Sequence, residues 1–367
     1  DGAKTTSSST VTVLNRPPVA SFTPSATQVL SGQVVTFNAT GSRDPDGFIL
    51  NYFWTFGDGA NGSGDIVQHS FARKGVYTVV LTVTDNDGAT ANATAVISVG
   101  NQLPTASYTY SPSFPIAGQI VAFNASGSHD PDGSIVSYIW NFGDGNITSV
   151  TVPLITHVYS VFGNYTTTLT VTDNDGGTAA SSQGIRVRDY PTAVFSYSPS
   201  SPITGQTVAF NASSSTPRGG TITSYVWNFG DGTPQVNTVN PVATHVYVTF
   251  GNYTVVLTVS DSESLSTTAS TTLRIRGYPL AAFNFTPSYP IEKQPVTFDA
   301  SSSAANGGVI ASCRWDFGDG NVTTVATSTV FHTYSSIGSY TVTLNITDSE
   351  GLTNTLSKVV SVRGYPR

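Results

Sequence analysis

The stretch Trp54-Thr-Phe-Gly-Asp-Gly59 decides the fold of this chain, because its pattern, Trp-x-Phe-Gly-Asp-Gly, occurs four times. The other copies begin at Trp140, Trp227 and Trp315, so the four tryptophans are separated by 86, 87 and 88 residues. A constant period of this length is the signature of tandem repeats, in which each repeat forms one structural unit. We therefore expect four successive domains of nearly equal size.

Two further motifs follow each copy and predict the secondary structure. The first is His-x-Phe/Tyr and the second is Gly-x-Tyr-Thr, which opens a run such as Tyr77 to Thr84 with many β-branched residues and a period of two. This alternation is typical of β-strands, and no stretch has apolar residues at helical spacing. About seven short strands per repeat fit a sandwich of two sheets. We expect the tryptophans in the core, with Tyr52, Tyr138, Tyr225 and Cys313, each two residues earlier, on the same face.

Together these motifs resemble the polycystic kidney disease (PKD) domain. The resemblance rests on Trp-x-Phe-Gly-Asp-Gly, the downstream His-x-Tyr, the Gly-x-Tyr-Thr-Val-x-Leu-x-Val-x-Asp strand and, in the first two repeats, Ser-x-Asp-Pro-Asp-Gly. It covers nearly the whole chain. It implies an all-β fold of four tandem immunoglobulin-like β-sandwich domains in an extended array, in an extracellular or cell-surface protein of archaeal or bacterial type. It implies no catalysis by the domain itself.

The repeat boundaries follow from the linkers, each of which carries a proline. We place the four repeats at residues 16–101, 102–188, 189–276 and 277–363. Residues 1–15 align with residues 87–101, so we interpret them as the last strand and linker of a preceding repeat. A strand donated to a neighbouring subunit is the alternative, ranked lower because all four repeats keep their own last strand. Residues 364–367 are expected to begin the linker to a further repeat.

Composition and charge exclude several classes of function. Only 10% of residues are charged, and 15 Lys and Arg against 22 Asp and Glu give a net charge of −7. With no basic run, the chain lacks the footprint of a nucleic-acid-binding protein. No apolar stretch approaches the roughly 18 residues of a membrane span. One cysteine, Cys313, forbids an internal disulfide framework, and we interpret it as a small buried apolar residue.

The residue types that invite a catalytic interpretation recur in every repeat. They are the aspartates of the Gly-Asp-Gly motif, Asp58, Asp144, Asp231 and Asp319, and the motif histidines, His69, His157, His245 and His332. A tight turn after the tryptophan strand explains the aspartates. A zinc site needs three or four converging ligands, whereas each repeat offers one histidine, with His129 as a lone extra. We therefore expect packed, hydrogen-bonded side chains and predict that the chain is not an enzyme.

Acidic loops at one end of the first two repeats give a sharper prediction. In an immunoglobulin-like topology these loops converge with the entry linker. The crowded side chains are Asn15, Asp44, Asp46, Asp85 and Asp87 in repeat 1, and Asn101, Asp130, Asp132, Asp173 and Asp175 in repeat 2. Such a set of oxygen atoms suits calcium, Ca²⁺, at the first two domain junctions. The alternative is that these residues are turn formers whose side chains cap their own backbone.

Repeats 3 and 4 both lack two of the loop aspartates and the linker asparagine. The positions of Asp44 and Asp46 become Pro217 and Gly219, then Ala305 and Gly307. In the linker, asparagine becomes Arg188 and then Arg276. Our hypothesis is that a guanidinium takes the place of the cation there. It pairs Arg188 with Asp261 and Glu263, and Arg276 with Asp348 and Glu350.

Candidate glycosylation sequons form a second surface signal. Asn-x-Ser/Thr begins at Asn38, Asn61, Asn92, Asn124, Asn146, Asn164, Asn211, Asn252, Asn284, Asn321 and Asn345. Few charges and many hydroxyl groups suit a surface kept soluble by glycans.

The leading functional hypothesis is a non-enzymatic extracellular structural protein. Four sandwiches joined by short linkers would form a stiff stalk, filament or surface-layer element, adhesive or self-associating through its faces, with neighbouring repeats as its first partners. The alternative is a ligand-binding accessory region, for polysaccharide or protein, of a secreted hydrolase. An aromatic platform for sugars does not recur, because Phe53 corresponds to Ile139, Val226 and Arg314.

Overall fold

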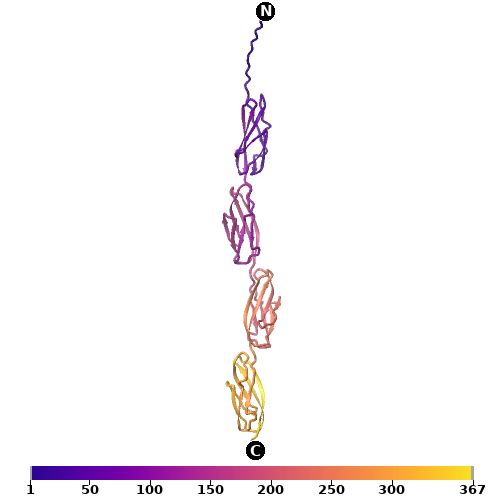
Figure 1. The fold of residues 1–367 in the computed structure, drawn as a ribbon, viewed down its shortest axis with the longest axis vertical. Coiled ribbons are helices and arrows are strands. Elements are labelled where there is room, and N and C mark those ends of the chain that lie inside the picture. The colour runs from indigo at the N-terminus through magenta and orange to yellow at the C-terminus, as the bar shows by residue number, and fades with distance from the viewer. Residues whose placement is uncertain (1, 365–367) are drawn as a thin grey trace. The chain divides into compact units, whose positions relative to one another are not determined.

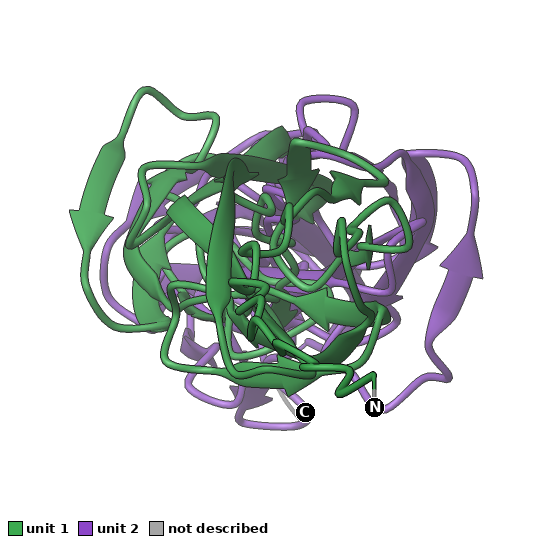
Figure 2. Cartoon of the chain, turned by 90° about the horizontal axis from the view of Figure 1, so that it is seen from above, with its two compact units in different colours: residues 1–187 green, residues 188–367 purple. Residues whose placement is uncertain are grey.

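The computed structural model describes residues 2–364 and forms two compact units, residues 1–187 and 188–367 (Figure 2). Each unit contains two of the four repeats. All regular structure in the described residues is β-strand, which confirms the predicted all-β class. The segment 2–18 carries no strand, and Asp1 lies outside the described residues, so the assignment of residues 1–15 to a preceding repeat stays a prediction. The predicted linker start at 364–367 falls almost wholly on residues outside the description.

Repeat 1 contains eight strands in two sheets. It follows the N-terminal segment in the indigo part of the ribbon in Figure 1. They are β1 (Thr23–Pro24), β2 (Gln28–Leu30), β3 (Val34–Asn38), β4 (Ile49–Thr55), β5 (Asn61–Ser63), β6 (Ile66–Ser70), β7 (Gly75–Asp85) and β8 (Thr90–Gly100). One sheet has the order β1-β3-β6 and the other β2-β8-β7-β4-β5. All neighbours are antiparallel except β2 and β8, which run parallel.

Repeats 2, 3 and 4 reproduce this arrangement with seven strands each. Repeat 2 has β9 (Thr109–Ser111), β10 (Ile120–Asn124), β11 (Ile135–Asn141), β12 (Ile147–Val150), β13 (Leu154–Val158), β14 (Gly163–Asp173) and β15 (Thr178–Val187). Repeat 3 has β16 (Ser196–Ser198), β17 (Thr207–Asn211), β18 (Ile222–Asn228), β19 (Val236–Thr238), β20 (Val242–Val246), β21 (Gly251–Asp261) and β22 (Ser266–Ile275). Repeat 4 has β23 (Asn284–Thr286), β24 (Pro295–Asp299), β25 (Ile310–Asp316), β26 (Val322–Val325), β27 (Thr329–Thr333), β28 (Gly338–Asp348) and β29 (Thr353–Val362).

Each repeat has its own closed core between its two sheets. The predicted tryptophans are fully buried, because they alternate along their strands with outward-facing residues. The position two residues earlier is buried as tyrosine in repeats 2 and 3 and as Cys313 in repeat 4, which is 2% exposed. Tyr52 is only partly buried but packs on the same core. No buried cluster crosses from one repeat to another, so each sandwich is a separate hydrophobic unit.

Candidate functional site

The aspartates and histidines singled out in the sequence form one hydrogen-bonded pair in every repeat. His69 Nε2 lies 2.7 Å from Asp58 Oδ2, and the equivalent pairs, His157–Asp144, His245–Asp231 and His332–Asp319, have the same separation. Asp58 also accepts the backbone N–H of Ala60, which closes the turn after the tryptophan strand. The expected structural roles are thus both present, joined by a contact that the sequence did not reveal.

The ring of each motif histidine is fixed by aromatic neighbours. His157 stacks on Phe142 with ring centroids 3.9 Å apart and meets Tyr159 edge-on at 4.7 Å. Tyr159 is fully buried and donates its hydroxyl to the carbonyl of Phe142. The second motif tyrosine, Tyr165, donates to the carbonyl of Val161, four residues earlier. This arrangement fixes the orientation of the histidine ring against its aspartate partner.

The paired aspartates remain ionised in spite of their partial burial. For Asp144, loss of solvent raises the pKa, but hydrogen bonds from the backbone and side chain of Asn146 and from His157 outweigh this effect. The net pKa of Asp144 lies below its usual value, as do those of the equivalent aspartates. A carboxylate stabilised in this way adds to the stability of the turn at neutral pH.

The acidic loops of repeat 1 converge with the linker as expected. Asn15 Nδ2 donates to Asp85 Oδ2 at 3.0 Å, and the backbone N–H of Arg16 donates to Asp46 Oδ2 at 3.1 Å. Asp85 is fully buried, and its other oxygen accepts the N–H groups of Asp87 and Ala89. Much of the cluster therefore caps its own turns, as the alternative to calcium predicts.

Repeat 2 repeats this geometry at its own entry. Asn101 Nδ2 donates to Asp173 Oδ2 at 2.8 Å, and the N–H of Gln102 donates to Asp132 Oδ2 at 3.1 Å. Asp175 N–H donates to Asp173 Oδ1 at 2.8 Å. Asp44 and Asp130 lie beside Asp46 and Asp132, so all ten residues of the calcium hypothesis lie at the entry ends of repeats 1 and 2.

Several oxygen atoms in these two clusters are buried without a hydrogen-bond partner. They are Asp44 Oδ2, both carboxylate oxygens of Asp130, Asp132 Oδ1 and Asn101 Oδ1. The pKa values of Asp44 and Asp130 are raised, first by burial and then by the neighbouring aspartates. Within residues 2–364, however, no three His, Cys, Asp or Glu side chains converge as a metal-binding group. The unpartnered oxygen atoms favour a bound cation, whereas the lack of three converging ligands among the described residues does not. Calcium therefore stays a prediction.

Two asparagines that the sequence did not single out tighten the acidic loops. Asn86 Oδ1 accepts the N–H of Phe48, and Asn174 Oδ1 accepts the N–H of Ser134. A Cβ at Gly47 would lie 2.1 Å from Asn86 Oδ1 and 2.5 Å from Asp44 Oδ2. This close approach explains the glycine of Asp-Pro-Asp-Gly. The signal was available in Asp85-Asn-Asp87, which recurs in repeat 2 as Asp173-Asn-Asp175.

In repeats 3 and 4 the linker arginines lie against the acidic turns, with a different register from that expected. Arg276 pairs in parallel with Ile203, just as Gly100 pairs with Leu30 in repeat 1. Arg276 therefore occupies the structural position of Gly100. The linker is therefore one residue shorter, and the arginine does not stand at the structural position of Asn101. Arg188 Nη1 donates to the carbonyl of Glu263 at 3.3 Å, and Arg276 Nη1 to that of Glu350 at 3.4 Å.

A second arginine, which no sequence motif singles out, binds the carboxylate of Glu350. Arg274, at the end of β22, donates through Nε to Glu350 Oε1 at 3.0 Å, and its Nη2 also contacts that oxygen. Nη2 donates further to the carbonyl of Gly307 at 2.6 Å. Phe250 packs close by, because a Cβ at Gly277 would lie 2.9 Å from Phe250 Cβ. Repeats 3 and 4 thus meet through cationic and apolar contacts.

Repeats 1 and 2 meet through hydroxyl, carboxylate and lysine groups. The hydroxyl of Ser31, a residue only 1% exposed, donates to Asp132 Oδ2, and Gln102 Nε2 donates to the carbonyl of Ser31 at 2.8 Å. Lys74 Nζ donates to the carbonyl of Asp175 at 3.2 Å and lies 3.9 Å from its carboxylate. The junction inside each unit is therefore fixed by specific side chains.

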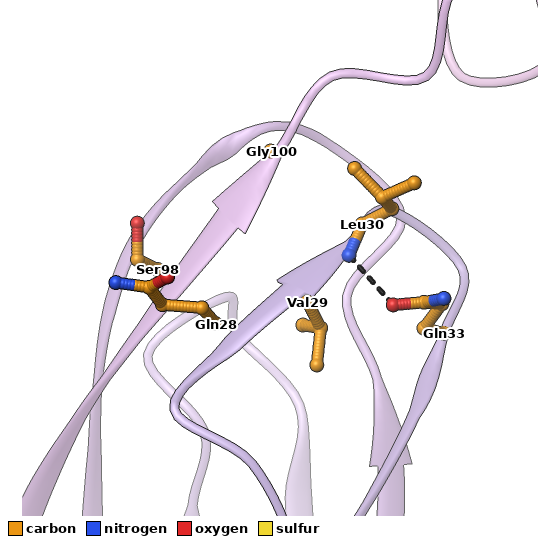
Figure 3. Close-up of a pocket in the computed structure, with 6 residues that line it drawn as sticks. All are labelled: Gln28, Val29, Leu30, Gln33, Ser98 and Gly100. Atoms are coloured by element: carbon orange, nitrogen blue, oxygen red, sulfur yellow. Dashed lines mark hydrogen bonds between the residues drawn. The ribbon is translucent and has the colours of Figure 1, made fainter.

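The end of repeat 1 that carries Ser31 is built on the parallel strands β2 and β8. A shallow cleft beside them is lined by Gln28, Val29, Leu30, Gln33, Ser98 and Gly100 (Figure 3). Gln33 Oε1 accepts the N–H of Leu30 at 2.8 Å and so closes the turn that holds Ser31. The same glutamine contact recurs in the other three repeats.

The sequons lie at the surface of the sandwiches. All of the predicted asparagines are exposed except Asn345, which is partly buried on the central strand β28. The Nδ2 atoms of Asn146 and Asn321 donate to the aspartate two residues earlier, at 3.0 and 3.1 Å. Asn38, Asn124 and Asn211 end equivalent strands, and each accepts the N–H of the sequon hydroxyl residue.

No helix capable of crossing a bilayer occurs in residues 2–364. Cys313 is buried, and desolvation raises the pKa of its thiol, which agrees with its interpretation as an apolar core residue.

Comparisons with known proteins agree with the repeated sandwich. The PKD domain family matches residues 15–99, 101–188, 189–276 and 279–363. The human dyslexia-associated protein KIAA0319 is 27% identical over 96% of this chain and 36% of its own length. The pre-pro-metalloprotease PrtV of Vibrio cholerae strain M66-2 is 32% identical over 46% of this chain and 17% of its own length. The chain thus spans about a third or less of these relatives.

One solved structure is similar to part of this chain. The crystal structure of the PKD1 domain of Vibrio anguillarum Epp is 38% identical, with a TM-score of 0.21, and covers 23% of this chain and 96% of that domain. The family match extends over all four repeats and includes the tryptophan, Gly-Asp-Gly and histidine motifs described above. The chain is therefore a member of the PKD domain family, with four tandem immunoglobulin-like domains.

Proposed function

We propose that this chain is a non-enzymatic structural part of an extracellular or cell-surface protein, a stiff stalk, filament or surface-layer element. The observation that carries the proposal is the pair of side-chain-specific junctions, Ser31 and Lys74 against repeat 2, and Arg274 against Glu350. Contacts of this kind restrict the motion of one domain on the next more than a linker does by itself. Four sandwiches with strands of about ten residues would reach on the order of 130–160 Å if joined end to end.

Small-angle X-ray scattering of the whole chain tests this proposal. A stiff array gives a maximum dimension near that estimate, and Ser31→Ala together with Lys74→Ala shortens the average dimension by loosening one junction. The matched control is Ser25→Ala with Lys4→Ala, which changes the same residue types away from the junction. A compact or broadly distributed wild-type chain would reject the stiff spacer.

A second candidate is a ligand-binding accessory region of a secreted hydrolase. It is favoured by relatives such as the Vibrio metalloprotease and the microbial collagenase of Vibrio alginolyticus, which is 38% identical over 18% of this chain and 8% of its own length. Co-sedimentation of the chain with insoluble chitin, cellulose and fibrillar collagen distinguishes the two functions. Saturable binding supports the accessory region, and its absence on all three supports the spacer.

We also propose that surface glycans and calcium complete the array. The glycan proposal rests on the exposed sequons, with Asn146 and Asn321 as the poorest acceptors because their Nδ2 atoms already donate to aspartate. Peptide mass spectrometry of chain secreted from an N-glycosylating host measures each occupancy. Equal occupancy at Asn146 and Asn124 would contradict this order.

The calcium proposal rests on the orphaned oxygens of the first two acidic loops.

A further inference from the structure

The entry ends of repeats 1 and 2 have the same internal geometry but differ in what covers them. In repeat 2, Asp132 Oδ2 accepts two hydrogen bonds, one from its own linker and one from the hydroxyl of Ser31 in repeat 1. In repeat 1, the equivalent Asp46 Oδ2 accepts the linker N–H of Arg16 at 3.1 Å. Asp132 is half-buried, whereas Asp46 is exposed.

The second acidic position shows the same difference. Asp175 of repeat 2 is half-buried under Lys74 of repeat 1. Its equivalent in repeat 1 is Asp87, which is exposed. We define the entry face of repeat 1 as Asp46 and Asp87. These two carboxylates are the equivalents of Asp132 and Asp175, with which repeat 2 binds repeat 1.

The exit end of repeat 4 does not match this face. Backbone hydrogen bonds place Glu292 where repeat 1 has Ser31. The N–H of Ser31 donates to the carbonyl of Gly100, and the N–H of Glu292 donates to that of Arg363. Arg363 is the equivalent of Gly100, because each pairs in parallel with the residue before the donor. Ile337 precedes Gly338 as Lys74 precedes Gly75, so the lysine is replaced by an apolar residue. A glutamate against Asp46 brings like charges together, which opposes association. Head-to-tail joining of identical copies is therefore disfavoured.

We propose that the entry face of repeat 1 is a docking surface for the exit end of another PKD repeat of the repeat 1 type, with a hydroxyl at the Ser31 position and a lysine at the Lys74 position. The inference rests on the proposed function as a repeat array. It adds that the order of repeats is selected by the chemistry of their ends. A hydroxyl and a lysine select an Asp-Pro-Asp-Gly entry, whereas Arg274 and Phe250 select the Gly307 entry of repeat 4.

A lengthened chain tests the docking surface. Residues 1–101 are followed by a second copy of residues 16–101 and then by residues 102–367, so that the exit end of one repeat 1 faces the entry face of another. Leu50→Val in the second copy marks its peptides by mass. The control chain carries Ser31→Glu and Lys74→Ile in the first copy, the residues that repeat 4 has at these positions.

Hydrogen–deuterium exchange read by mass spectrometry gives the outcome. We expect the marked peptide that contains Asp44 to Gly47 to exchange about tenfold more slowly in the lengthened chain than in the control, as one charge-assisted hydrogen bond allows. Equal exchange in the two chains would overturn the docking surface. The scattering test of the spacer is independent of this result, so a stiff array with equal exchange rejects only the docking inference.

Sedimentation of the unchanged chain provides a second arm. We expect a single species with no concentration dependence, because Glu292 opposes Asp46. Concentration-dependent end-to-end oligomers would overturn the selection between repeat ends.

Discussion

Replacement of Gly143 by alanine tests how tightly the Gly-Asp-Gly turn is packed. Gly143 has a φ of 82°, and a Cβ added there would lie 2.5 Å from the carbonyl oxygen of Thr166 and 2.9 Å from its nitrogen. Thr166 belongs to β14, which is paired with β15, so this backbone cannot retreat without loss of sheet hydrogen bonds. The positive φ costs about 1–2 kcal/mol and the overlap about 1–3 kcal/mol more. We expect Gly143→Ala to destabilise repeat 2 by about 2–5 kcal/mol.

Gly145, two residues away in the same turn, is the matched control. Its φ is 96°, but no atom lies within 4 Å of its added Cβ. Gly145→Ala should therefore cost only the conformational term, about 1–2 kcal/mol. Hydrogen exchange of peptides from β11 and β14 in the whole chain measures the stability of repeat 2 by itself. Equal losses for the two variants, or a neutral Gly143→Ala, would refute the packing argument.

Three other predictions address the paired aspartates, the acidic loops and the cysteine. Because hydrogen bonds lower the pKa of Asp144 in the fold, its stabilisation is present above the unfolded pKa and is lost as the pH falls through the folded value. Asp144→Asn should thus destabilise repeat 2 by about 1–3 kcal/mol at neutral pH, with a smaller difference from wild type below about pH 4 in urea titrations. Calcium should slow hydrogen exchange at residues 44–47 and 130–133 and leave 305–308 unchanged, and no effect of either calcium or EDTA at the first two loops would reject the cation. Cys313 should react with iodoacetamide only after unfolding in urea, and rapid alkylation of the native chain would show that the thiol is exposed.

The sequence predicts the repeated sandwich well because its main signals are local. The tryptophan, the Gly-Asp-Gly turn and the alternation after Tyr77 each specify structure within a few residues. The prediction is weaker where two distant segments meet. Asp58 and His69 were both identified, but their contact depends on how the turn folds back onto β6.

The repeat ends show a second limit of sequence alignment. Counting back from the next proline matches Arg276 with Asn101, whereas the strand register matches it with Gly100. Because the linker is one residue shorter, the sequence fits either alignment of Arg276. Only the backbone pairing shows which alignment is correct. Arg274 and Ser31 were missed for a related reason. Each lies in one repeat and has its partner in the next, so no pattern within a single repeat reveals its role.

The four separate cores have a mechanical consequence. Because no buried cluster is shared, rupture of one sandwich under load leaves the other three folded. A released repeat, drawn straight, spans roughly 300 Å at about 3.4 Å per residue. A sudden pull on the chain would therefore be absorbed stepwise, one sandwich yielding before the next.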